Sequence, residues 1–155
     1  MRFIPTLVAI WLALMSCQAG QGDPERGENL ISPKDQDAAL MGRWLLVQIN
    51  RDGKDINLDN LEGSVREIGE NTYSIKSMNG QPITGRYTID IEAKPRTIDE
   101  FVDNGRFKGG TLKGIYLVES DRLTISFGSP GQDRPEDFES KPGTQYTVAI
   151  HKKLE

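Results

Sequence analysis

The fold is decided by residues 94–143, KPRTIDEFVDNGRFKGGTLKGIYLVESDRLTISFGSPGQDRPEDFESKPG. Three segments of this stretch alternate apolar and polar residues, at 97–102, 111–119 and 123–127. Such alternation is typical of strands that lay one face on a core. Turn residues separate the segments, at Asp103-Asn104-Gly105 and at Ser120-Asp121. The stretch therefore predicts consecutive antiparallel strands joined by hairpins.

The same pattern continues on both sides of this stretch. Strand-like segments precede it at 42–50, 63–68, 72–78 and 83–91, and a last apolar face follows at Tyr146, Val148 and Ile150. Asn79-Gly80 is a strong hairpin signal because both residues tolerate positive φ. About eight strands, spaced by about 10 to 15 residues, predict an antiparallel barrel or sandwich.

One short helix is expected before the first strand. Ser32 can cap it, Pro33 fits its first position, and Gly42 ends it, which places the helix at about 34–41. The strand after it, 42–50, is apolar on both faces, which is typical of a strand covered on both sides.

Five short motifs carry a resemblance to a known family. They are Gly42-Arg43-Trp44, Lys94-Pro95 with Ile98-Asp99, Thr111-Leu112-Lys113-Gly114-Ile115-Tyr116, Arg134-Pro135 with Phe138, and Lys141-Pro142-Gly143. In this order they resemble an uncharacterised lipocalin-like domain family that is abundant in Planctomycetes, usually on secreted or lipid-anchored chains. The resemblance covers roughly residues 38–155. It implies an all-β fold: an antiparallel, up-and-down lipocalin-like barrel of about eight strands, here preceded by the short N-terminal helix.

The resemblance also implies a role for the tryptophan of the first strand. In the lipocalin superfamily this residue, here Trp44, closes the base of the barrel. It often packs against an arginine of the last strand. This chain has Lys152 and Lys153 in that strand, so the arginine contact is not expected.

A ligand, if the barrel binds one, would contact the inward faces of the strands. The candidate residues are Trp44, Tyr87, Ile89, Tyr116, Val118, Ile125, Phe127 and Val148. Binding sites are mostly apolar with a few placed polar groups, and the hydroxyls of Tyr87 and Tyr116 would supply these. The ligand would be small and apolar or amphipathic. The alternative is a filled barrel in which the same residues are core, and whose loops contact another envelope protein.

Signs of catalysis or of a cofactor are few. His151 is the one histidine and is expected at the surface, whereas a zinc site needs several nitrogen or sulfur ligands. We expect no metal, no cofactor and no enzymatic activity. A net charge of −4 argues against a nucleic-acid partner. The loop element Arg134 to Phe138 is either a recognition loop or a structural one, in which Arg134 bonds carbonyls or Asp99 and Phe138 covers a strand.

The N-terminal residues indicate export and attachment to a membrane. Residues 1–17, MRFIPTLVAIWLALMSC, resemble a bacterial lipoprotein signal peptide whose lipobox ends at Cys17. An acylated Cys17 would hold the protein on a membrane of the cell envelope, with Gln18 favouring the outer over the inner membrane. Residues 18–31 are polar and glycine-rich and predict a flexible tether to the domain at 32–155. If the lipobox is not used, the protein is secreted.

Overall fold

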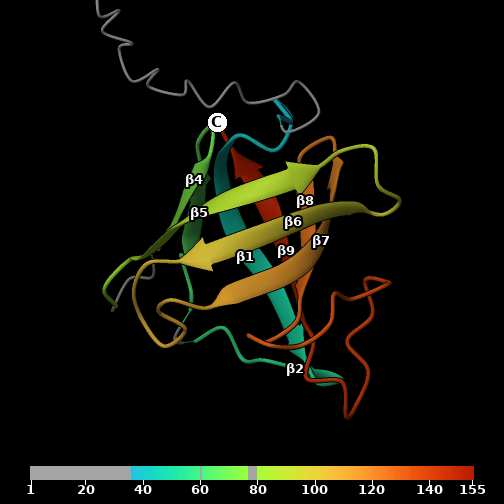
Figure 1. Cartoon of the computed structure of the whole chain (residues 1–155). Helices are drawn as coiled ribbons and strands as arrows, with labels where there is room; N and C mark the ends of the chain where they lie inside the picture. The colour runs from blue at the N-terminus through green and yellow to red at the C-terminus, as the bar shows by residue number, and fades with distance from the viewer. Residues whose placement is uncertain (1–35, 60, 77–79) are drawn as a thin grey trace, which may run out of the picture. The chain divides into compact units, whose positions relative to one another are not determined.

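The computed structural model describes residues 36–59, 61–76 and 80–155, and in this part of the chain it contains strands but no helix (Figure 1). The strands of the described part are β1 (Gly42–Arg51), β2 (Lys54–Asp55), β3 (Val65–Ile68), β4 (Thr72–Lys76), β5 (Ile83–Asp90), β6 (Arg96–Val102), β7 (Thr111–Glu119), β8 (Arg122–Phe127) and β9 (Thr147–Leu154).

Eight of these strands close into a barrel. From β3 to β9 each strand pairs antiparallel with the next, and β1 pairs with β3 on one side and with β9 on the other. β2 adds only a two-residue hairpin arm to the end of β1. The predicted all-β, eight-stranded antiparallel barrel is therefore confirmed. Closure pairs the edges that an open sheet would expose.

The segment before β1 is a turn in its described part, residues 36–41. The Leu40 N–H donates to the Asp37 carbonyl at 3.0 Å, and the Asp37 carboxylate accepts from the Ala39 N–H at 3.0 Å. An aspartate that bonds its own turn in this way competes with helix formation. The predicted helix (34–41) is thus absent where the structure describes it, and its first two residues lie outside the described part.

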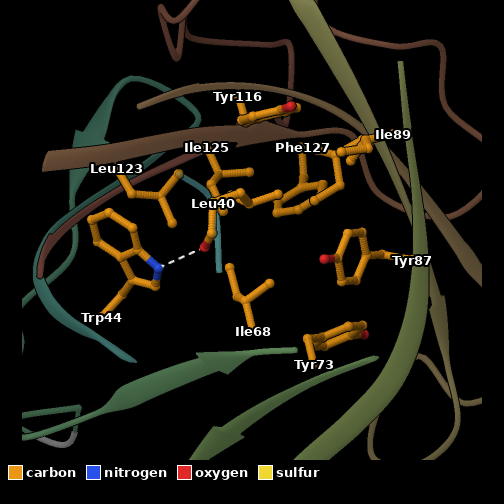
Figure 2. Close-up of a cluster of buried hydrophobic side chains, with 11 residues drawn as sticks. Leu40, Trp44, Ile68, Tyr73, Tyr87, Ile89, Tyr116, Leu123, Ile125 and Phe127 are labelled. Atoms are coloured by element: carbon orange, nitrogen blue, oxygen red, sulfur yellow. Dashed lines mark hydrogen bonds between the residues drawn. The ribbon is translucent and has the colours of Figure 1, made fainter. Parts of the chain in front are cut away.

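This turn and Trp44 close one end of the barrel, which we call the base. Leu40 and Trp44 are both fully buried, and the indole Nε1 donates to the Leu40 carbonyl at 2.9 Å (Figure 2). The Lys153 ammonium lies 5.2 Å from the centroid of the Trp44 ring, within the range of a cation–π interaction. The last strand does therefore supply a cation to the tryptophan, as a lysine instead of the arginine.

Two glycines make room for aromatic rings inside the barrel. A Cβ at Gly114 would stand 2.5 Å from Cδ1 of Phe127, and one at Gly85 would stand 2.7 Å from Cε1 of Tyr73. Both distances are shorter than side-chain packing allows. The rings of Tyr73 and Phe127 therefore pack directly over glycines of the neighbouring strands.

The long loop between β8 and β9 is fastened to the barrel wall by Arg134. Its guanidinium donates to the carbonyls of Gly114 at 2.6 Å and Ile98 at 3.3 Å, and to the Asp99 carboxylate at 3.1 Å. Asp99 stands on the outer face of β6, so the loop runs outside the barrel. Phe138 of the same loop lines a hollow over the outer faces of β1 and β9. The contacts predicted for Arg134 in its structural role are therefore present.

Candidate ligand-binding site

Most of the residues predicted to face inward do lie together inside the barrel. Figure 2 shows their side chains pointing toward one another from several strands. Six belong to one buried cluster and Val118 packs against it half-buried; the six are Trp44, Tyr87, Ile89, Tyr116, Ile125 and Phe127. Ile68, Tyr73 and Ile98 complete the cluster, and Leu40 and Leu123 extend it to the base. At this end the barrel is filled with side chains.

Val148 is the exception among the predicted residues. In the register of β8 and β9 it stands opposite Ser126, whereas Ala149 stands opposite the core residue Ile125. Directly opposed residues share a face of the sheet, so Val148 points outward. It lines the hollow beneath Phe138 on the outside of the barrel. The prediction that Val148 faces a ligand inside the barrel is therefore wrong.

The two predicted tyrosine hydroxyls already have partners in the protein. The Tyr87 hydroxyl donates to the Gly69 carbonyl at 2.6 Å, and the Tyr116 hydroxyl donates to the Asp37 carboxylate at 3.0 Å. Burial raises the pKa of Tyr87 to about 12 and also raises the pKa of Tyr116, so both hydroxyls keep their protons. Their hydrogen bonds hold the base of the barrel together.

The interior also holds a buried ion pair that was not predicted. Arg66 of β3 donates through Nη1 to the carboxylate of Glu100 on β6, and the two side chains are only 6% and 2% exposed. The guanidinium carbon lies 5.4 Å from the ring centroid of Tyr73 and 5.7 Å from that of Phe127. Burial raises the pKa of Glu100, and the charge of Arg66 opposes that rise.

A signal for this pair is present in the sequence. Glu100 stands between Ile98 and Val102 in the alternation of its strand, and Arg66 stands two residues before Ile68. Both charged residues therefore occupy the apolar register of a strand. A charge in that register is an inward-facing charge, and such a charge needs a partner.

His151 lies inside the barrel as well. It stands opposite the core residue Leu123, faces inward and is 4% exposed. The prediction of a surface histidine is therefore wrong. Burial, together with the positive charge of Arg66, lowers the pKa of His151 to about 3. The imidazole is consequently neutral near pH 7.

Three buried polar atoms in this region have no hydrogen-bond partner among the described residues. They are Nε of Arg66, the hydroxyl oxygen of Tyr73 and Nδ1 of His151. Each belongs to an inward-facing side chain that is under a tenth exposed. A buried polar group without a partner typically costs about 1–3 kcal/mol. The interior therefore offers one donor and two groups that can either donate or accept.

The end opposite the base is partly open, and we call it the mouth. It contains a cavity of about 130 Å³ lined by Arg51, Phe107, Leu112, Phe127, Gly128, Ser129 and Thr147. Leu112 and Thr147 are inward-facing and only half-buried. Phe127 borders this cavity and also lies against Arg66, so its ring connects the mouth to the buried pair.

A groove of about 710 Å³ crosses the barrel wall elsewhere, over β3, β4 and β5. It is larger than the mouth cavity but open to solvent, and two charged side chains of its lining, Arg43 and Glu67, already pair with each other. Glu67 pairs with Arg43 at 3.5 Å and with Lys76 at 3.2 Å. We therefore place the candidate site at the mouth and the interior polar groups, where buried atoms still lack partners.

Across 36–59, 61–76 and 80–155, no group of three or more His, Cys, Asp or Glu side chains is placed to hold a metal ion. In the same residues no helix is long and apolar enough to cross a membrane. Cys17 lies outside the described part. No protein-family model, curated protein or solved structure matches this chain.

Proposed function

We propose that this protein is a lipid-anchored binding module of the cell envelope whose barrel takes up a small apolar or amphipathic molecule through the mouth. One observation carries the proposal. Inside the barrel, Arg66, Tyr73 and His151 each keep a buried polar atom without a partner in the described part of the chain, and Arg66 lies against Phe127, which borders the mouth cavity. A polar group of a ligand would satisfy such atoms, and the surrounding apolar side chains would contact its body.

Binding fits these groups better than catalysis does. The carboxylate of Glu100 is held by Arg66, and the pKa of His151 is lowered to about 3. General acid–base catalysis works best when the pKa of the group lies near the working pH. A histidine that stays neutral through the physiological range can accept or donate a hydrogen bond to a ligand without exchanging protons.

The test uses the neutral fluorescent probe N-phenyl-1-naphthylamine and two leucines of β7. Leu112 is inward-facing and borders the mouth cavity, whereas Leu117 is 40% exposed on the outer face. The wild-type chain should enhance the fluorescence of the probe. Leu112→Trp should fill the mouth and abolish the enhancement, whereas the matched change Leu117→Trp should leave it intact.

A second candidate function is an interaction module with a filled barrel. It is favoured by the packed base and by the small volume of the mouth cavity, about 130 Å³ against the roughly 300–1,000 Å³ of common ligand pockets. In a filled barrel Leu112→Trp would overpack the interior and cost about 1–3 kcal/mol. No probe binding by the wild type, together with that destabilisation, would replace our proposal with this one.

The anchor belongs to the same proposal and rests on Leu14-Met15-Ser16-Cys17. Acylation of Cys17 would give durable attachment, because two or more acyl chains bind a membrane far more firmly than one. Metabolic labelling with a palmitate analogue should mark the wild-type protein and not Cys17→Ala. Wild-type protein that stays wholly in the soluble envelope fraction without detergent would show that the protein is secreted instead.

A further inference from the structure

The charges inside the barrel are balanced, which bears on the kind of molecule it can hold. Between base and mouth, Arg66 and Glu100 contribute one positive and one negative charge, and they pair with each other. His151 is neutral near pH 7. Further charged groups stand at its ends: Arg51 at the mouth, and at the base Lys153 over Trp44 and Asp37 against Tyr116, where Asp37 pairs with Arg96.

A charged ligand would disturb this balance. A carboxylate beside Arg66 would also stand near Glu100, and an ammonium group near Glu100 would stand beside Arg66. Neither new charge would find an uncommitted opposite charge, and a buried charge without one is costly. An uncharged polar group carries no such penalty and can still bond the atoms that lack partners.

The unpartnered atoms also indicate which polar group of a ligand would fit. Nε of Arg66 can only donate, whereas the Tyr73 hydroxyl and Nδ1 of His151 can donate or accept. A ligand oxygen that accepts a hydrogen bond would therefore satisfy Nε of Arg66, whether the other two groups donate or accept. A hydroxyl, ketone, ester or amide oxygen meets this requirement without adding charge.

Resting on the proposed binding function, we propose that the barrel selects uncharged amphiphiles bearing an acceptor oxygen, such as long-chain alcohols or ketones, over carboxylates of the same length. Glu100 is the residue that sets this preference, because its carboxylate neutralises Arg66 and repels an incoming anion. Removing the charge of Glu100 should turn the same interior into a carboxylate site.

The experiment compares octan-1-ol with octanoate as competitors for bound N-phenyl-1-naphthylamine near neutral pH, on the chain from residue 18 to 155. A cooperative melting transition is first required of every variant. With the wild type, octan-1-ol should displace the probe at about tenfold lower concentration than octanoate. In Glu100→Gln the order should reverse. Glu67→Gln, the same change on the outer face of β3, should behave as the wild type.

Two further measurements test the inference if Glu100→Gln is less stable than the wild type. Octanoate should then raise the melting temperature of Glu100→Gln and not that of the wild type, because a ligand that binds only the folded state stabilises it. Tyr73→Phe, which removes one unpartnered hydroxyl, should weaken displacement by octan-1-ol several-fold.

Three outcomes would overturn the inference. The first is that octanoate displaces the probe from the wild type as well as octan-1-ol does, and the second is that the order of the two competitors is the same in Glu100→Gln as in the wild type. Octanoate binding that disappears in Arg51→Gln would show that the anion stays at the mouth. Failure of the wild type to bind the probe at all is a different result, since it removes the proposed function itself.

Discussion

At the scale of single residues, the Arg66–Glu100 pair is the most costly feature of the barrel interior. Each side chain is nearly inaccessible to solvent, so both charges have lost their hydration. In other proteins the replacement of such a pair by apolar residues is often neutral or stabilising, whereas removal of one partner costs about 3–5 kcal/mol. Stability of the fold alone therefore gives little reason for this pair, which supports a role in binding.

The pH dependence of stability should report on His151. Its folded-state pKa is about 3, below the ordinary value of 6.5. Between these values the unfolded chain takes up a proton that the folded chain does not, so the stability is lost as the pH falls through this window. At pH 5 the free energy of unfolding should be about 2 kcal/mol smaller than at pH 7 through this residue alone.

Urea denaturation of the wild type and of His151→Gln at both pH values measures this contribution. The comparison is needed because burial raises the pKa of Glu100, and a carboxylate with a raised pKa acts in the opposite sense, adding stability as the pH falls. The difference between the two proteins isolates His151. An equal pH response of both would mean that the imidazole is hydrated in the folded protein.

The alternation of apolar and polar residues predicted the apolar part of the site but not its charged pair. Tyr87, Tyr116 and Ile125 were found because apolar side chains at every second position face a core. Arg66 and Glu100 were not found, because a charged residue is by default assigned to the surface. Only their place in the apolar register distinguishes them, and that place becomes visible once the strand boundaries are known.

At the scale of elements, the loop between β8 and β9 depends on Arg134. This side chain donates to two carbonyls and to the carboxylate of Asp99, and it is 29% exposed. Arg134→Ala should cost about 1–2 kcal/mol, since bonds from a charged donor exceed neutral ones and solvent screens part of the ion pair.

Denaturant midpoints of Arg134→Ala and Arg134→Lys test this expectation. The lysine keeps the charge but lacks the planar fork that reaches several acceptors at once, so it should recover only part of the loss. The exposed change Lys141→Gln, in the same loop, is the control. Full recovery with lysine would mean that charge, and not the carbonyl bonds, fastens the loop.

The same loop explains why the inward face of β9 was predicted wrongly. Tyr146, Val148 and Ile150 alternate as an inward face would, yet the register of β9 turns Val148 outward beneath Phe138. A loop that covers the outer face makes apolar residues suitable there, so alternation alone cannot tell inside from outside. In β1 a bulge between Leu46 and Gln48 shifts the alternation of inward and outward residues. No turn residue at this point of the sequence indicates the bulge.

At the scale of the whole molecule, the barrel has two unlike ends. The base is closed by Trp44 and Leu40, which are fully buried, whereas the mouth keeps half-buried inner residues such as Leu112 and a cavity. Barrel closure and strand number were predictable, because about eight alternating segments in sequential hairpins favour that architecture. The difference between the ends was not, since it depends on where the turn before β1 packs.

This asymmetry predicts unequal effects of two truncations at the N-terminus on the melting temperature. A chain that starts at residue 32 loses only the polar and glycine-rich segment 18–31, so its melting temperature should stay close to that of the chain from residue 18. A chain that starts at residue 42 also loses Leu40, which is fully buried and accepts the hydrogen bond of the Trp44 indole.

Loss of a buried leucine costs about 2–5 kcal/mol, and a domain of somewhat over 100 residues loses about 4 °C of melting temperature per kcal/mol. The chain from residue 42 should therefore melt at least about 8 °C below the chain from residue 32. Thermal unfolding followed by circular dichroism compares the three chains directly. If the drop came already with the start at residue 32, the segment 18–31 would pack on the barrel, and its role as a simple tether would have to be abandoned.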